Sequence, residues 1–321
     1  MLPLRSITFV ALAFALAAGA ARAQTDAAAT TEPQAPTEQQ FAQCAGADGT
    51  AADARLVACS ALIASGGLNP TNLAAAYDNR GAAEAAQGHF DQAIADYAQA
   101  IQVNPDDLKA YENLGLAYAG EGRYDRAIAA DDQALKRDPN DAVAYDARGL
   151  AEAAGGGFDR AVADYDKAIA LAPTAIAYYD RGNAYAAQLR YDRAIADYDA
   201  ALKLGPSAAI LNNRGLAEAA QGHADRAIAD YTQAITLDPR SAFAFNNRGL
   251  AEAAQGHADR AVADYDKAIA LDPNYAAAFY NRGLARQPTD AAAAKADLTK
   301  ARQLDPQIRL VAGTGDAAPA R

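Results

Sequence analysis

Apolar and polar positions recur along most of this chain with a period of 33 or 34 residues. In each period, an alanine-rich segment precedes a segment whose apolar residues fall on one helical face. Residues 258–271 illustrate the second segment, because Ala261, Tyr265 and Ala268 follow one another at spacings of four and three. The pattern predicts two helices per period. A period of this length predicts a solenoid in which each repeat packs only against its neighbours.

Glycine and proline keep the same period. The recurring glycines are Gly81, Gly115, Gly149, Gly182, Gly215, Gly249 and Gly283, and the recurring prolines are Pro105, Pro139, Pro173, Pro206, Pro239, Pro273 and Pro306. Small residues such as Gly249 and Ala261 would allow the two helices of a repeat to approach closely, with Tyr265 filling the space beside them. Asp259 is the expected N-cap of the second helix, and Pro273 would end that helix.

These positions resemble the tetratricopeptide repeat over residues 72–306. The aromatic-x-x-x-Gly start recurs as Tyr77/Gly81, Tyr111/Gly115, Tyr145/Gly149, Tyr178/Gly182, Phe245/Gly249 and Phe279/Gly283, and the Ala-x-x-x-Tyr-x-x-Ala core as Ala93/Tyr97/Ala100 and Ala194/Tyr198/Ala201. The resemblance implies an all-α fold, a right-handed α-superhelical solenoid of about seven helix-turn-helix repeats. It also implies a concave surface built mainly from first helices, and a protein- or peptide-binding role without enzymatic activity.

Three repeats depart from this pattern. Asp131 stands where five repeats have tyrosine, and Leu211 replaces the first aromatic residue of repeat five. In repeat seven, Leu298 replaces the tyrosine and residues 286–289 shorten the turn. We expect its second helix, residues 291–303, to act as a solvated C-terminal cap.

The first 23 residues have the pattern of a signal peptide. A short basic region precedes an apolar run at 7–18, and Ala21-Arg22-Ala23 fits a cleavage site. We expect cleavage after Ala23 and a periplasmic or secreted protein. An uncleaved anchor is the alternative, although the apolar run is short for a bilayer span of about 20 residues. Residues 24–40, rich in Ala, Thr, Pro and Gln, predict a disordered linker, and 307–321 a disordered tail.

Two cysteines, Cys44 and Cys59, lie just before the repeats. In an exported chain, an even cysteine count favours a disulfide. The alternative is two free buried thiols. Residues 41–67 also carry one helical pattern that matches half of a later repeat, so they predict a disulfide-stapled N-terminal cap that covers the first apolar face of the solenoid.

Charge and motifs restrict the function further. A net charge of −11 argues against nucleic acid and anionic membrane surfaces as partners, and favours a neutral or basic protein or peptide. The three histidines, His89, His223 and His257, occupy equivalent turns of different repeats, which are too far apart for one zinc ion. Catalytic motifs are not found, so we expect no cofactor, metal or enzymatic activity.

Arginine precedes most of the repeat glycines, and glutamate often follows four residues later. The pairs are Arg80/Glu84, Arg148/Glu152, Arg214/Glu218 and Arg248/Glu252. This spacing predicts ion pairs along one helix face. Repeat two has the apolar residues Leu114 and Tyr118 at these positions, as typical members of the resembled family do, so we interpret the ion pairs as replacing an apolar pair. A stripe of glutamates that binds a basic ligand is the functional alternative.

A series of amide side chains supplies the candidate binding residues. In the resembled family, the position before each arginine lines the concave groove, and a row of amides can pair with the N–H and C=O groups of a peptide. The candidate concave-face residues are Asn79, Asn113, Asp180, Asn183, Asn213, Asn247 and Asn281. Ala147 and Asp180 interrupt the asparagine series. The alternative is a solvated polar helix face.

The neighbouring groove position changes along the chain. It is occupied by Asp78, Glu112, Asp146, Tyr179, Asn212, Asn246 and Tyr280 in repeats one to seven. The early groove is therefore acidic, and we expect it to prefer basic or neutral segments.

Two roles follow from these observations. The first is a cell-envelope scaffold, without enzymatic activity, that binds an extended or helical segment in its concave groove. The second is a structural component of a secretion or envelope-biogenesis complex, which uses the convex face and the solenoid ends. The oligomeric state and the identity of the partner are left open by the sequence.

Overall fold

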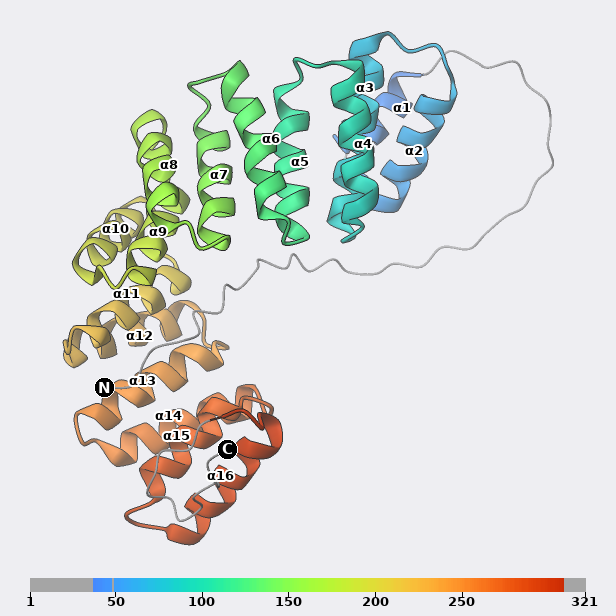
Figure 1. Cartoon of the computed structure of the whole chain (residues 1–321). Helices are drawn as coiled ribbons and strands as arrows, with labels where there is room; N and C mark the ends of the chain where they lie inside the picture. Colours follow the sequence, from blue (N-terminus) through green and yellow to red (C-terminus); the bar gives the residue numbers. More distant parts are fainter. Residues whose placement is uncertain (1–36, 48, 309–321) are drawn as a thin grey trace, which may run out of the picture. The chain divides into compact units, whose positions relative to one another are not determined.

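The computed structural model describes residues 37–47 and 49–308, where every regular element is an α-helix (Figure 1). The helices of these residues are α1 (Glu38–Ala45), α2 (Ala52–Ala64), α3 (Pro70–Ala86), α4 (Phe90–Val103), α5 (Leu108–Gly120), α6 (Tyr124–Arg137), α7 (Ala142–Ala154), α8 (Phe158–Leu171), α9 (Ala175–Ala187), α10 (Tyr191–Leu204), α11 (Ala208–Ala220), α12 (Ala224–Leu237), α13 (Ala242–Ala254), α14 (Ala258–Leu271), α15 (Ala276–Arg286) and α16 (Ala291–Leu304). The predicted all-α fold of paired helices is confirmed.

The chain forms two compact units, Met1–Gly157 and Phe158–Arg321. Repeat three is divided between them, because α7 belongs to unit 1 and α8 to unit 2. The other repeats are helical hairpins that lie within one unit. They are α3–α4 and α5–α6 in unit 1, and α9–α10, α11–α12, α13–α14 and α15–α16 in unit 2. The uninterrupted sequence period does not signal this division.

First helices form one row in each unit. In unit 1, α3 contacts α5 and α5 contacts α7, and in unit 2 the helices α9, α11, α13 and α15 contact one another in series. Among the helices named above, no two second helices of neighbouring repeats are in such contact. First helices are therefore spaced more closely than second helices, and they form the concave side of each unit.

The core of a repeat is a tyrosine against a glycine. Tyr97, Tyr198, Tyr231 and Tyr265 are almost fully buried. A Cβ atom at Gly249 would lie 2.7 Å from the ring of Tyr265, so only glycine fits at this close approach of the two helices. The predicted pairing of small residues with tyrosine is confirmed.

Most first helices begin with a side-chain cap, which satisfies a free backbone N–H group. The capping residues of α3, α5, α7, α9, α11 and α13 are Asn69, Asp107, Asp141, Thr174, Ser207 and Ser241. The expected N-cap at Asp259 is wrong, because α14 begins after His257, whose side chain makes no cap hydrogen bond. Asp259 lies instead in the first turn of α14, where its negative charge interacts favourably with the positive end of the helix dipole.

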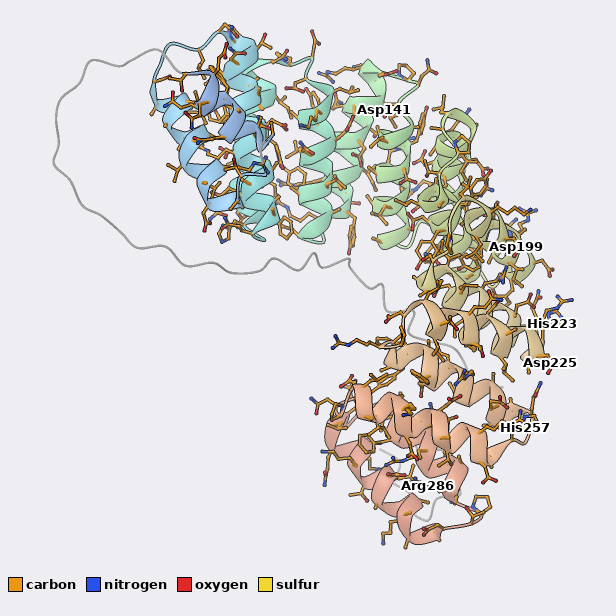
Figure 2. All side chains as sticks on the ribbon, turned by 180° about the vertical axis from the view of Figure 1, so that it is seen from behind. Asp141, Asp199, His223, Asp225, His257 and Arg286 are labelled. Carbon is orange, nitrogen blue, oxygen red and sulfur yellow. A yellow bond between two sulfur atoms is a disulfide. The ribbon has the colours of Figure 1, made fainter. Side chains whose placement is uncertain are left out.

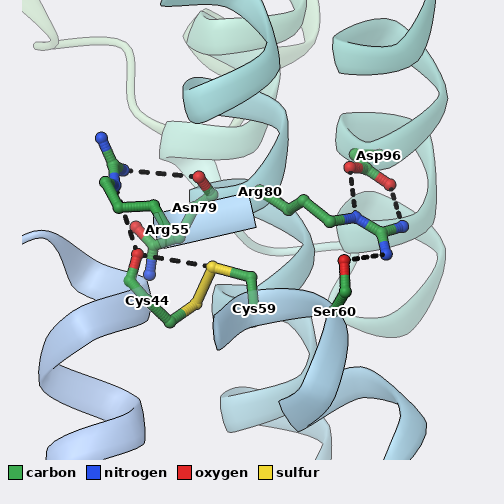
Figure 3. Close-up of a disulfide and its surroundings, with 7 residues drawn as sticks. All are labelled: Cys44, Arg55, Cys59, Ser60, Asn79, Arg80 and Asp96. Atoms are coloured by element: carbon green, nitrogen blue, oxygen red, sulfur yellow. Dashed lines mark hydrogen bonds and ion pairs between the residues drawn. A yellow bond between two sulfur atoms is a disulfide. The ribbon is translucent and has the colours of Figure 1, made fainter. Parts of the chain in front are cut away.

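The N-terminal cap is a hairpin of α1 and α2 that packs on α3. The predicted disulfide joins Cys44 on α1 to Cys59 on α2, and both residues are buried (Figure 3). Helix α1 begins at Glu38, because Thr37 and Gln40 form a capping box there. Residues 38–40, which we expected in the linker, are therefore helical.

Several sequence expectations lie outside the described residues. The signal peptide at 1–23, linker residues 24–36 and tail residues 309–321 belong to this group. Within the described residues, no helix combines the length and apolar character needed to cross a bilayer.

Candidate functional site

The concave side of unit 2 carries side-chain amides that bond from one first helix to the next. Asn281 Nδ2 on α15 donates to Asn246 Oδ1 on α13 at 2.9 Å. Asn247 Nδ2 on α13 donates to Asn212 Oδ1 on α11 at 3.0 Å. In these bonds the nitrogen belongs to the later repeat and the oxygen to the earlier one.

Contacts within two helices join these bonds into one series. Asn246 Nδ2 approaches Asn247 Oδ1 at 3.4 Å, and Asn212 Nδ2 approaches Asn213 Oδ1 at 3.5 Å. Asn213 Nδ2 then donates to the Asn183 Oδ1 on α9 at 2.9 Å. We call the series the amide chain; its members are Asn183, Asn212, Asn213, Asn246, Asn247 and Asn281.

The amide chain ends on two tyrosines. The hydroxyl of Tyr198, which is buried in the core, donates to Asn183 Oδ1 at 2.8 Å. Asn213 Nδ2 lies 3.0 Å from the hydroxyl oxygen of Tyr179, which accepts a second bond. Burial raises the pKa of Tyr179, so the hydroxyl stays neutral near pH 7. The end of the amide chain that is earliest in the sequence is thus attached to the core of repeat four.

Exposed apolar side chains lie beside the amides. Leu216 and Leu250 follow Asn213 and Asn247 by three residues, so each leucine shares a helix face with its asparagine. Their exposed fractions are 38% and 44%, which is high for leucine. Phe243, one turn before Asn247, is also exposed. The concave side of unit 2 therefore combines amides with apolar contact area.

The same positions in unit 1 carry charge. Asn113 Nδ2 on α5 donates to Asp78 Oδ1 on α3 at 2.7 Å, and Lys109 Nζ lies 3.4 Å from Asp78 Oδ2. Asp78 is buried, and burial raises its pKa although the bonds from Asn113 and Lys109 act against this. An asparagine again bridges two first helices, but its acceptor is a carboxylate.

Two further carboxyl groups on this side are held above their ordinary pKa. Burial, together with the nearby carboxyl of Asp141, raises the pKa of Glu112 to about 7. Burial raises the pKa of Asp146 to about 6, and its Oδ1 atom is enclosed without a hydrogen-bond partner. The predicted acidic positions Asp78, Glu112 and Asp146 are thus partly desolvated as well as acidic.

The remaining candidates are placed less distinctively. Asn79 occupies the position before the arginine on α3, and its backbone carbonyl accepts a hydrogen bond from Arg55 at 3.4 Å. Asp180 occupies the same position on α9, and Ala147 on α7 leaves a gap in unit 1. The structure therefore joins Asn183, Asn213, Asn247 and Asn281 in one series, and it places Asn113 in a separate bridge.

For Arg80, Arg214 and Arg248, the predicted ion pairs with the glutamate four residues later are wrong. These three arginines reach the second helix of their own repeats instead. Arg214 donates to both carboxylate oxygens of Asp230, through Nε at 2.9 Å and Nη2 at 2.5 Å. The equivalent pairs are Arg80–Asp96, Arg181–Asp197, Arg248–Asp264 and Arg282–Asp297. The second helix offers a better acceptor because it presents a buried aspartate in a two-pronged geometry.

The same arginines also reach the preceding repeat. Arg214 Nη1 lies 2.5 Å from Asp199 Oδ1 on α10, and Arg80 Nη1 donates to Ser60 on α2 at 3.3 Å (Figure 3). Other partners in this position are Asp132, Asp166, Thr232 and Asp266, for Arg148, Arg181, Arg248 and Arg282. We call the arginine with its own aspartate and the preceding side chain the arginine staple.

The glutamates pair with histidines at the turn between the two helices of a repeat. Glu218 Oε2 is 2.6 Å from His223 Nδ1, and Glu252 Oε2 is 2.7 Å from His257 Nδ1. Both histidines lie on one edge of unit 2, at equivalent turns (Figure 2). Repeat one has the same pair, Glu84 and His89, at 2.8 Å. In the part of the chain that the structure describes, no three metal-binding side chains converge.

Sequence reasoning missed the arginine staple, although repeat two contains a signal for it. There, Leu114 stands for the arginine and Ala130 for the aspartate, sixteen residues apart. Both partners of the pair change together, which indicates that they touch. The joint change could have located the contact before the structure was known.

Comparison with known proteins concerns the repeats. A tetratricopeptide repeat family model matches residues 79–142, 147–209 and 179–243, and a second TPR repeat model matches 249–287. A search of curated proteins found no significant match.

Solved structures share the fold. A tetratricopeptide repeat protein from Parabacteroides merdae ATCC 43184 is 20% identical, with a TM-score of 0.59, over 77% of this chain and 99% of that chain. A chain of the APC/C hetero-tetramer Cut9-Hcn1 is 16% identical, with a TM-score of 0.59, over 80% of this chain and 51% of that chain. Pseudomonas aeruginosa pilF is 19% identical, with a TM-score of 0.55, over 63% of this chain and 93% of that chain. At these identities the likeness concerns the fold alone.

Proposed function

Because the chain belongs to the tetratricopeptide repeat family, whose members are typically protein- or peptide-binding scaffolds, we propose that it binds an extended or helical segment of a partner on its concave surfaces. In this proposal the protein has no catalytic activity of its own. The observation that carries the proposal is the amide chain of unit 2 with exposed leucines beside it.

The amide chain supports binding because its side chains are already oriented. Free asparagine side chains lose rotamer entropy when they bind a ligand. In unit 2, bonds such as Asn247 Nδ2 to Asn212 Oδ1 fix each amide before any ligand arrives. An amide has two N–H groups and two carbonyl lone pairs, so Asn247 keeps one N–H and one lone pair for a backbone.

Charge supports a neutral or basic partner. On the concave side of unit 1, Asp78, Glu112 and Asp146 are partly desolvated, and a cationic side chain beside them would restore favourable electrostatics. The net charge of −11 acts in the same direction at longer range. Binding to unit 1 is therefore expected to weaken as salt is added.

We place the protein in the periplasm or outside the cell. The N-terminal sequence through Ala23 supports export. The disulfide between Cys44 and Cys59 supports an oxidising compartment. Fractionation of cells that express the full chain, with N-terminal sequencing of the product, tests this placement. A cytosolic product that begins at Met1 would contradict it.

The binding proposal is tested with peptides selected from a random display library on the chain without its first 23 residues. The test variant replaces Asn213, Asn247 and Asn281 together by alanine. We expect selected peptides to bind this variant about 10-fold more weakly or worse, because three amides are lost. The matched control replaces Lys167 and Lys267, exposed on second helices, and should bind normally. Equal affinity for the triple variant, when circular dichroism shows it folded, would reject the proposal.

A second candidate role is assembly through the edge formed by the turns between repeats. Four exposed leucines end the second helices there, and they are Leu171, Leu204, Leu237 and Leu271. Such a row supports contact with another protein, because exposed apolar residues at regular intervals are costly in water. Sedimentation of the intact chain tests self-association. A complex lost in the Leu204→Lys, Leu237→Lys variant would support this role, and a monomer at all concentrations would exclude self-assembly by this edge.

A further inference from the structure

Three consecutive first helices of unit 2 present the same uncharged pair of side chains on the concave side. The pairs are Asn213/Leu216 on α11, Asn247/Leu250 on α13 and Asn281/Leu284 on α15. We propose that these three pairs bind an uncharged segment in the polyproline II conformation, with an apolar residue at every third position. The inference rests on the proposed function and names the kind of segment that the surface fits.

The asparagine and leucine side chains of these pairs are uncharged, and the arginine next to each asparagine is held in an arginine staple. Arg214, beside the first pair, is held by Asp230 and Asp199, and Arg248 by Asp264 and Thr232. The guanidinium groups therefore point towards second helices and are neutralised there. A charged ligand residue would lose water at these pairs and gain no partner, so an uncharged segment fits best.

The spacing of the first helices selects the conformation. Helices in direct contact, as α11, α13 and α15 are, lie about 8–10 Å apart. Three residues of polyproline II span about 9.3 Å and return to the same face. Two residues of a β-strand span about 6.8 Å, so a strand would lose register with the second pair. A polyproline II segment therefore offers one equivalent residue to each repeat.

The amides select against a helical ligand. A helix satisfies its own backbone groups, whereas a polyproline II segment leaves its N–H and C=O groups without internal partners. Asn247 keeps one N–H and one carbonyl lone pair after its bonds to Asn212 and Asn246. The free carbonyl lone pair of one amide per repeat can therefore accept one N–H group of the ligand in every three residues. A ligand in which two of every three residues are proline has this number of N–H groups, because proline has none.

The leucines supply the contact area for the third residue. Leu216 and Leu250 are 38% and 44% exposed. Each lies three residues after its asparagine, so a ligand residue bound at the amide lies against the leucine. Covering these side chains removes apolar surface from water, which supplies affinity that the amides alone lack.

The test uses synthetic peptides and the chain without its first 23 residues. The probe repeats Pro-Pro-Leu, and its composition control repeats Pro-Pro-Ser. A strand-period control alternates Thr and Leu, and a helical control sets Leu in an Ala and Gln background. We expect the probe to bind about 10-fold more tightly than each control, and Leu216→Ser with Leu250→Ser to remove most of this difference. The matched variant Leu116→Ser, on α5 in unit 1, should leave the affinity unchanged.

Three outcomes would overturn the inference. One is equal or tighter binding of the strand-period or helical control. Another is no binding of the probe at millimolar concentration. The third is probe binding that the unit 2 leucine variants leave intact. If library peptides still lose affinity in the triple asparagine variant, the proposed function stands while this inference fails. If those peptides also bind the triple variant normally, both fail.

Discussion

Repeat α5–α6 in unit 1 and repeat α11–α12 in unit 2 differ at two positions of the first helix, the arginine position and the concave position two residues before it. In α5–α6, Leu114 occupies the arginine position and packs against the cluster of Ala93, Tyr97 and Ala117, and the concave side carries Glu112. In α11–α12, the contact to the second helix is ionic, through Arg214, and the concave side carries Asn212. The repeat tolerates either arrangement, because only the glycine and the small residues are needed for the close helix approach.

The two units also differ in the acceptor of the hydrogen bond that joins neighbouring first helices. Asn113 and Asn247 each donate to the preceding first helix, at 2.7 Å and 3.0 Å. The first acceptor is the buried carboxylate of Asp78 and the second is the neutral amide of Asn212. A single position, the one before the asparagine, therefore sets the electrostatics of a concave surface whose geometry is otherwise preserved.

The largest expected effect comes from breaking an arginine staple in unit 2. Arg214→Ala would leave the buried Asp230 without its partner, and we expect unit 2 to lose about 3 kcal/mol or more. The double variant Arg214→Leu, Asp230→Ala copies the Leu114 and Ala130 of α5–α6 and should be within about 1 kcal/mol of the wild type, because no buried charge remains at this pair. Thermal unfolding followed by hydrogen exchange in α11 and α12 measures both. A double variant as unstable as the single one would show that the two arrangements are not interchangeable.

Reducing the disulfide should affect unit 1 alone. Cys44 and Cys59 close a loop with a sequence separation of 15, for which chain entropy predicts a contribution of about 3 kcal/mol. We expect faster hydrogen exchange in α1 and α2 under reductant, and no change in α11 to α16. Unchanged protection of α1 would show that the apolar contacts of the cap suffice without the bond.

Removing one bridge from each unit should cost different amounts. Asn113→Ala takes a hydrogen bond from a buried carboxylate, and we expect a loss of about 2 kcal/mol. Asn247→Ala takes one from a neutral amide, for which about 1 kcal/mol is expected. Urea unfolding measures both, with Asn79→Ala as the control. Equal costs would mean that the charge of Asp78 does not strengthen the bridge.

The smallest expected effect is the pH response of unit 1. Burial raises the pKa of Glu112 from 4.5 to about 7, so the folded state holds its proton more tightly than the unfolded state. Stability should therefore fall as the pH rises from about 4.5 to about 7 and then level off. Glu112→Gln should reduce this slope and gain about 1 kcal/mol at pH 8, since partial exposure to solvent reduces the effect, and the slope that is left up to about pH 6 would come from Asp146. The exposed Asp106→Asn is the control, and an unchanged slope in Glu112→Gln would assign the pH response to another group.

The helices and their pairing could be predicted because they depend on local patterns. The step from Gly249 to Ala261 and Tyr265 describes one helix crossing, and it recurs without reference to distant residues. The disulfide could be predicted for a similar reason, since two cysteines in one short segment leave only one partner for each.

Partners of the charged side chains could not be predicted in this way. Arg214 has a glutamate one turn away on its own helix, yet it bonds to Asp230 across the hairpin. Spacing along one helix does not rank these two acceptors, because the ranking depends on burial and on the direction of the side chain. The bridge from Asn247 to Asn212 spans two repeats, and the division of the chain after Gly157 depends on packing between repeats. Neither leaves a mark in the period.

The arginine staple has a consequence for how the number of repeats evolves. The position that receives the guanidinium from the following repeat is Asp199 in one case, Thr232 in another and Ser60 in the cap. Aspartate, threonine and serine thus all serve as the acceptor at this contact between neighbouring repeats. Unequal recombination that deletes or duplicates a whole repeat therefore joins ends that already fit, and the protein can gain or lose length without a matching second mutation.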